Sequence, residues 1–217
     1  MYEYVTDKEF ISDMKQLCGD IMQRLCHQLK EDCDIGAIFY MVGSGARNLI
    51  LQNNSNPIDL DYNLEIVRCD DFGDLKGIKE SAQKTLNKVL REYDMRDCDG
   101  SKSSLMTKRV YFKTGNQTEF SMDIAIVCKD EEGNLYRLIH NKTGWVSFDS
   151  YEWRMAPNSK AVREKAAAVK KAHAWKDVRD QYKDIKNRYL RMNDHSHPSY
   201  ICYIEAVNNV YNSLKHR

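Results

Sequence analysis

The chain has 217 residues, enough to bury a substantial core in one large domain or in a domain with an appendage. Its 33 Lys and Arg residues nearly balance its 32 Asp and Glu residues, so the net charge points to neither nucleic acid nor a membrane. The N-terminus has no signal-peptide pattern, and the longest apolar run, Ala37 to Val42, is too short to span a bilayer. We therefore predict a cytoplasmic protein without a membrane partner.

The first two expected elements are a helix and a strand. Thr6 and Glu9 match a capping box, with Thr6 as the N-cap. Behind them, apolar residues recur at spacings of three and four, which predicts an amphipathic helix over about 7–32. The apolar run 37–42 that follows is typical of a buried strand.

A glycine-rich turn, Gly43-Ser44-Gly45, comes next and precedes a short helix expected over 46–51. Glycine permits positive φ and the close approach of an anion, and backbone N–H groups at a helix start favour phosphate. The Ser44 hydroxyl adds a donor, and Arg47 could either reach the phosphate or cap the helix. Because plain tight turns have the same sequence, this turn indicates phosphate binding only together with other features.

Two aspartates share one face of the next expected strand. Residues 58–67 alternate between apolar and polar side chains, which predicts a half-buried strand. Asp59 and Asp61 lie on its polar face, roughly 7 Å apart along the strand. The pair alone is weak support for a site, because a solvated strand face explains it equally well.

A third acid lies on a later strand. Up to about residue 150 the pattern predicts a mixed α/β unit, with a helix over 74–95 and strands over 105–114, 119–128 and 135–140. Asp123 and Ser121 point away from the apolar face of their strand, so neighbouring strands would bring three acids together. Asp is disfavoured in strands, and clustered carboxylates raise each other's pKa unless a cation neutralises them. A divalent metal ion is the simplest explanation.

Residues 151–217 are expected to be helical and to pack on the preceding core, because no Gly/Ser/Pro-rich linker precedes them. Ser159 is a candidate N-cap for a long helix that ends at a polar break over 193–199. His195 and His197 in this break are spaced like a zinc pair. No further ligand lies at a suitable spacing, so we interpret them as part of the break.

The segment 160–192 is strongly basic, with eleven Lys and Arg residues against four acids. A solvated helix face is the plainer explanation for this charge. The functional alternatives are a clamp on a triphosphate, with Lys170 and Lys171 as the candidates, or a track for an RNA acceptor.

Together these features resemble the DNA polymerase beta-like nucleotidyltransferase superfamily. The family pattern is an apolar residue, Gly, Gly or Ser, a spacer, Asp-apolar-Asp, and a third acid in a later strand. Here Val42 precedes Gly43-Ser44, fourteen residues separate Ser44 from Asp59-Leu60-Asp61, and Asp123 follows. The resemblance covers about residues 7–140. It implies an α+β fold with a mixed sheet and flanking helices in a catalytic core over 1–150, plus a C-terminal helical layer.

The resemblance also implies transfer of NMP from an NTP to a hydroxyl, with release of pyrophosphate. Asp59, Asp61 and Asp123 would hold two Mg²⁺ ions, with Mn²⁺ as an alternative, and Asp123 would lie nearest the attacking oxygen. Gly43 and Ser44 would hold the β and γ phosphates. The acceptor stays open between an RNA end, a protein side chain, a small molecule and a second nucleotide, as do the nucleobase and the oligomeric state. The alternative function is a weakly catalytic NTP-binding or partner-binding module of toxin–antitoxin or defence type.

Overall fold

The computed structural model describes residues 1–145, 148–194 and 197–215. The chain divides into two compact units, neither of which is a continuous stretch. The first, which we call the sheet unit, comprises Asp7–Gly45 and Pro57–Ala156. The second, which we call the helical unit, comprises Met1–Thr6, Ala46–Asn56 and Pro157–Arg217.

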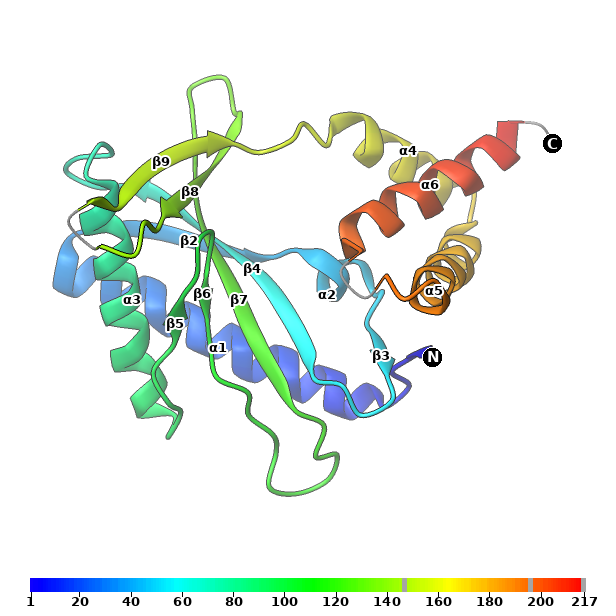
Figure 1. Ribbon diagram of the computed structural model, residues 1–217, viewed down its shortest axis with the longest axis horizontal. Coiled ribbons are helices and arrows are strands. Elements are labelled where there is room, and N and C mark those ends of the chain that lie inside the picture. Colours follow the sequence, from blue (N-terminus) through cyan, green and yellow to red (C-terminus); the bar gives the residue numbers. More distant parts are fainter. Residues whose placement is uncertain (146–147, 195–196, 216–217) are drawn as a thin grey trace. The chain divides into compact units, whose positions relative to one another are not determined.

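The sheet unit is built on a seven-stranded sheet with the order β2-β4-β7-β6-β5, in which β8 pairs with β7 and β9 (Figure 1). Strands β4 and β7 run parallel, whereas the other pairs are antiparallel. This arrangement confirms the expected α+β class with a mixed sheet. The strands are β2 (Gly36–Met41), β4 (Ile58–Arg68), β5 (Asp99–Gly100), β6 (Leu105–Met106), β7 (Phe120–Lys129), β8 (Leu135–Asn141) and β9 (Ser150–Met155).

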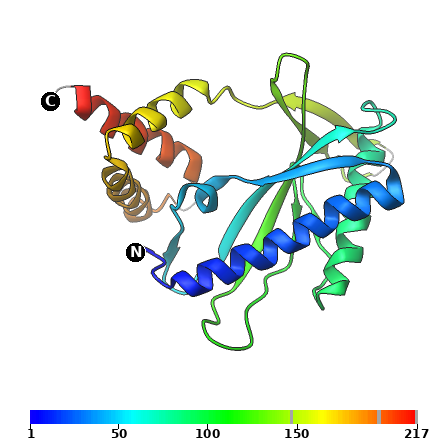
Figure 2. The same ribbon diagram turned by 180° about the vertical axis from the view of Figure 1, so that it is seen from behind.

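Two long helices, α1 (Lys8–Cys33) and α3 (Leu75–Glu92), belong to the same unit and pack against each other. Helix α1 crosses behind the strands in Figure 1 and in front of them in Figure 2, and it contacts β2. Its extent agrees with the predicted helix, but the predicted cap is wrong. Asp7, not Thr6, is the N-cap, because the Asp7 carboxylate accepts a hydrogen bond from the Phe10 N–H at 3.0 Å.

The alternation predicted for β4 holds where the strand begins. There Leu60 is buried while Asp59 on the opposite face is exposed. Further along, both faces are covered, so that Asn63 and Glu65 are each only 5% exposed, although the pattern placed them on a solvated face. Among the polar side chains of this face, Asp59 and Asp61 are therefore accessible, whereas Asn63 and Glu65 are buried.

Three other predicted elements are corrected. The short helix expected over 46–51 begins earlier, as α2 (Gly43–Arg47), and its last predicted residue lies in β3 (Leu51–Asn53). The strand expected over 105–114 pairs only at β6 and at an isolated bridge at Val110. Strand β9 lies where only helices were expected. In its sequence, Ser-Tyr-Glu-Trp-Arg-Met, apolar and polar residues alternate with the period of two of a strand, and it pairs with β8.

In the helical unit, β1 (Tyr2–Tyr4) pairs with β3, and α6 (Ser199–Lys215) contacts both α4 (Lys160–Lys171) and α5 (Trp175–Arg191). The buried core of this unit consists of Leu49, Ala166, Val169, Ala174, Val178, Tyr182, Ile185, Cys202, Tyr203, Ala206, Val207 and Val210.

The predicted long helix is broken between α4 and α5. His173 has a φ of 56°, which a right-handed helix cannot contain. Ser159 occupies the N-cap position of α4 but makes no capping hydrogen bond with its side chain. His195 lies outside the described residues, whereas His197 is described. None of the described helices combines the length and apolarity needed to cross a membrane.

Candidate active site

Three carboxylates lie on one face of two paired strands in the sheet unit. In the parallel register of β4 and β7, Asp61 is opposite Asp123 and Asp59 is opposite Ser121. Neighbouring strands lie about 4.8 Å apart, and residues two positions apart share a face. The three carboxylates and the Ser121 hydroxyl therefore occupy the four corners of one small area, which we call the acidic face.

Each acid on this face has a different environment. The exposed Asp59 accepts a hydrogen bond on Oδ1 from the Ser121 Oγ at 2.5 Å. Asp123 is half-buried, and in the part of the chain that the structure describes its Oδ1 is a buried acceptor without a hydrogen-bond partner. A buried unsatisfied carboxylate oxygen is costly unless a donor or cation joins it, so Asp123 has room for a ligand that protein groups do not supply.

The glycine turn lies directly against Asp61. Gly43 has a φ of 64°, and a Cβ atom at this position would come within 1.9 Å of the Asp61 Oδ2. The Val42 N–H donates to the Asp61 backbone carbonyl at 2.8 Å, which fixes the turn to β4. Only glycine combines this backbone conformation with so close an approach. The geometry thus places the proposed phosphate turn beside one of the proposed metal ligands.

Lys15 supports the same turn from α1, and nothing in the sequence pattern singled it out. Its Nζ donates to the Gly45 carbonyl at 2.8 Å, and burial lowers the pKa of this lysine. Lys15 borders the apolar stripe of α1, where a long aliphatic stem with a charged end is unremarkable. Only the three-dimensional contact shows that it helps to fix the turn.

The oxygen donors of the acidic face suit a hard divalent cation such as Mg²⁺ or Mn²⁺. No group of three His, Cys, Asp or Glu side chains is gathered closely enough to hold a metal ion within residues 1–145, 148–194 and 197–215. Asp59 instead points one oxygen at Ser121. The fit therefore rests on donor chemistry, on the shared strand face and on the unsatisfied oxygen of Asp123.

A fourth carboxylate on the same strand face is neutralised by a lysine. Glu65 accepts two hydrogen bonds from the Lys129 ammonium, at 2.9 and 2.8 Å. The Glu65 side chain is only 7% exposed, against 46% for Lys129, and the pair raises the pKa of Lys129. Glu65 is thus already satisfied and does not add to the acidic face.

The basic candidates Arg47, Lys170 and Lys171 belong to the helical unit. The Arg47 guanidinium lies 4.5 Å from the centre of the Tyr203 ring. Burial raises the pKa of Tyr203, and the positive charge of Arg47 opposes that rise. Lys170 lies over the Trp175 ring at 4.6 Å, and Lys171 is exposed at the end of α4. Arg47 and Lys170 therefore both contact aromatic rings of their own unit.

Most of the other basic side chains in 160–192 also bind within the helical unit. Carboxylates accept hydrogen bonds from three of them, and uncharged groups accept from three more. The pairs are Lys176–Asp180, Lys183–Glu3, Arg188–Glu205, Lys165–Asn208, Lys186–Ser199 and Arg179 with the Asn48 carbonyl. These contacts account for much of the positive charge without a ligand.

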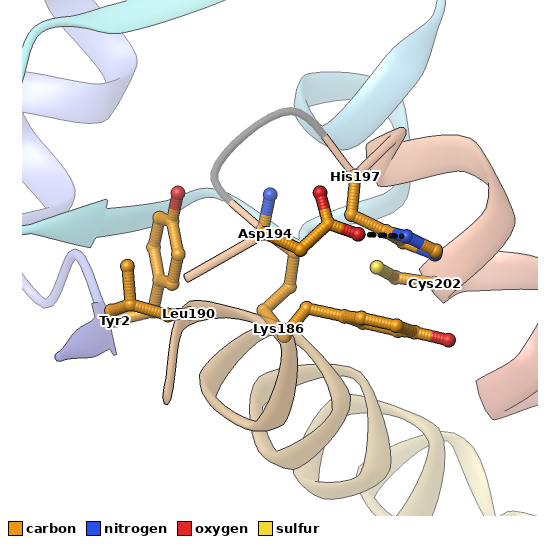
Figure 3. Close-up of a pocket in the computed structure, with 7 residues that line it drawn as sticks. Tyr2, Lys186, Leu190, Asp194, His197 and Cys202 are labelled. Carbon is orange, nitrogen blue, oxygen red and sulfur yellow. Dashed lines mark hydrogen bonds and ion pairs between the residues drawn. The ribbon is translucent and has the colours of Figure 1, made fainter. Parts of the chain in front are cut away.

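The helical unit also has a small pocket, shown in Figure 3. There the His197 Nδ1 lies 3.0 Å from an Asp194 oxygen. The His197 imidazole stacks on the Tyr189 ring. Lys186 points past the Tyr2 ring, 4.6 Å from its centre, and burial lowers the pKa of this lysine. The described lining residues include none of the site residues predicted from the sequence.

Comparison with known proteins shows the fold. No family model and no curated protein matches the sequence. A structure of E. coli CdnC with ATP matches 93% of this chain and 61% of that chain, with a TM-score of 0.59 and 15% identity. Vibrio cholerae DncV cyclic AMP-GMP synthase, in complex with the linear intermediate pppA(3′,5′)pG, matches 84% of this chain and 63% of that chain, with a TM-score of 0.58 and 9% identity. Elizabethkingia meningoseptica CdnE cyclic dinucleotide synthase with GTP and Apcpp matches 89% of this chain and 69% of that chain, with a TM-score of 0.53 and 10% identity.

The chain therefore has the polymerase beta-like nucleotidyltransferase fold that these structures share, which confirms the fold expected from the sequence. It spans about 60% of the length of the CdnC chains that it matches. At identities this low, the likeness concerns the fold and leaves the chemistry to be argued from the residues.

Proposed function

We propose that this chain is a metal-dependent nucleotidyltransferase that moves NMP from an NTP to a hydroxyl acceptor. The observation that carries the proposal is the pairing of Asp61 with Asp123 across β4 and β7, with Asp59 on the same face and Gly43 against Asp61. Two-metal phosphoryl chemistry needs carboxylates that converge on one point, and a glycine turn at a helix start beside them can hold the phosphates. The shared fold supports the same class of reaction.

In this proposal Asp59, Asp61 and Asp123 would hold the metal ions, and Asp123 would lie nearest the acceptor oxygen. Gly43 and Ser44 hold the β and γ phosphates. When bound, the Mg²⁺ or Mn²⁺ ions would neutralise the triphosphate and lower the pKa of the acceptor hydroxyl. The acceptor oxygen forms a bond to the α phosphorus, the bond from that phosphorus to the bridging oxygen breaks, pyrophosphate leaves, and the hydroxyl proton passes to solvent.

We further propose that the acceptor is the ribose hydroxyl of a second nucleotide. Two of the similar structures are cyclic dinucleotide synthases, and the DncV structure holds a linear dinucleotide intermediate. An RNA end, a protein side chain and a small molecule are the competing acceptors, and the test below separates them.

The test incubates the chain with each α-³²P-labelled NTP and Mg²⁺, first without an added acceptor and then with RNA or cell extract. We expect labelled oligonucleotide product without an added acceptor. Label that appears only on RNA, protein or a small molecule would reassign the acceptor. NTP binding without turnover under every condition would instead favour the weakly catalytic binding module.

Asp61→Asn and Asp123→Asn test the site itself. Each should lower turnover by roughly 10²- to 10³-fold, the scale of removing one main electrostatic stabiliser. Asp20→Asn is the matched control, because Asp20 is exposed on α1 in the same unit and carries the same charge change. Turnover within a few-fold of the parent in either site variant would rule out the assignment.

A further inference from the structure

The fourth corner of the acidic face is occupied by the hydroxyl of Ser121, beside the three carboxylates. Ser121 lies opposite Asp59 and two residues before Asp123 on β7. Its Oγ donates to the Asp59 Oδ1 at 2.5 Å. We propose that Ser121 is a positioning residue that orients the Asp59 carboxylate for metal binding, an inference that rests on the proposed nucleotidyltransferase function.

Asp59 is the acid that most needs such a partner. Asp61 is half-buried against the backbone of Gly43, and Asp123 is half-buried, whereas Asp59 is exposed near the start of β4. An exposed carboxylate rotates freely unless a hydrogen bond holds it, and that freedom is lost when a metal binds. The Ser121 bond fixes one carboxylate oxygen and leaves Oδ2 for the cation.

The chemistry of the fourth corner also fits a hydroxyl better than the alternatives. A fourth carboxylate there would add like charge and raise the pKa values of its neighbours. An apolar side chain could not hold Asp59. Hydrogen-bond partners that orient metal-binding side chains typically contribute about 10- to 100-fold in metal affinity. Ser121 has the position, the donor and the distance for that role.

The experiment measures Mn²⁺ affinity by electron paramagnetic resonance, in the presence of a non-hydrolysable NTP analogue, for the whole chain. Ser121→Thr and Ser121→Val form the matched pair, because Thr and Val have nearly the same shape and both suit a strand, but only Thr keeps the hydroxyl. We expect S121V to weaken Mn²⁺ binding by about 10- to 100-fold and S121T to stay within about threefold of the parent. Circular dichroism confirms that both variants fold.

A double-mutant cycle of Mn²⁺ affinities shows whether Ser121 acts through Asp59. In an Asp59→Ala background, S121V should cause no further loss, because the side chain that Ser121 orients is absent. Equal Mn²⁺ affinities of S121T and S121V would overturn the inference, as would a full additional loss in the Asp59→Ala background. If the parent itself binds no Mn²⁺, the proposed function fails first and the role of Ser121 fails with it. If the parent binds Mn²⁺ and Asp59→Ala weakens that binding while S121V does not, only the inference about Ser121 is wrong.

Discussion

The acidic face and the basic segment are both dense in charge, yet the structure organises them in opposite ways. On the sheet, a period of two and a parallel register bring Asp59, Asp61 and Asp123 to one face of two strands. In the helical unit, the basic residues spread over α4 and α5, and most of them bind groups of their own unit. Charge density in a sequence therefore does not indicate a site unless backbone geometry makes the charges converge.

The largest expected effect is the loss of folding when the C-terminal helices are separated from the rest of the chain. We propose that these helices do not form an independently folding domain, because their unit also contains residues 1–6 and 46–56. Residues 157–217 produced alone should fail to fold cooperatively. Tyr2 and Asn187 exchange hydrogen bonds of 2.7 and 3.0 Å between the N-terminal segment and α5. Leu49, only 1% exposed, fills the core of the same unit. Circular dichroism melts of the fragment and of the whole chain make the comparison.

A substitution in the whole chain tests the same prediction by a second measurement. Leu49→Ala should lower the free energy of unfolding by about 2–5 kcal/mol, the usual cost of emptying a leucine site in a core. Urea denaturation measures the loss. A cooperative melt of the isolated fragment, or an L49A chain as stable as the parent, would contradict the account. A protease cut near Pro157 should likewise release no separately folded piece.

These contacts mark the limit of what the sequence could predict. Helix α1, strands β2, β4 and β7 and the shared face of the aspartates follow from local periodicity, because apolar spacing decides which side is buried. The contributions of residues 1–6 and 46–56 to the helical unit have no such pattern. Tyr2, Tyr4 and Asn48 bind partners on α5 that are more than a hundred residues away. The sequence placed Ser121 on the polar face of its strand, but it could not predict the contact of Ser121 with Asp59 or that of Lys15 with Gly45. Their roles come from register and from a single long contact.

The next largest effect should come from Gly43→Ala, which tests whether geometry rather than charge makes the acidic face. The substitution changes no charge, but its Cβ would meet the Asp61 Oδ2 at 1.9 Å and push that carboxylate aside. A displacement of about 1 Å near the chemistry can cost roughly 10²-fold in rate, so turnover should fall by about that factor.

Gly115→Ala is the matched control for the backbone conformation. Gly115 has a φ of 76°, similar to that of Gly43, but nothing lies within 4 Å of a Cβ placed there. G115A should therefore carry only the backbone strain, about 1–2 kcal/mol of stability, and keep its turnover. Similar losses of turnover in both variants would show that strain, and not the contact with Asp61, is responsible.

The smallest expected effect concerns the basic segment, for which we propose that Lys170 and Lys171 contact the triphosphate. Exposed ion pairs contribute about 0.2–1 kcal/mol each, so the double change to Ala should weaken NTP binding by roughly 2- to 30-fold at low salt. The loss should shrink at higher salt, because the Debye length falls to about 8 Å at 0.15 M. Isothermal titration at two salt concentrations measures both.

Lys176→Ala is the control, because Lys176 is also exposed in this segment but already binds Asp180 at 2.6 Å. Its loss should leave NTP affinity unchanged.

An RNA track predicts a different result for the double change of Lys170 and Lys171. NTP affinity would survive, RNA affinity would fall, and the salt dependence of RNA binding would lose about 0.7 units of slope per phosphate contact. If neither affinity changes, Lys170 and Lys171 are ordinary surface residues. The substrate would then be bound by the acidic face, whose charges converge on two strands, and not by the basic segment, whose charges are spread over helices.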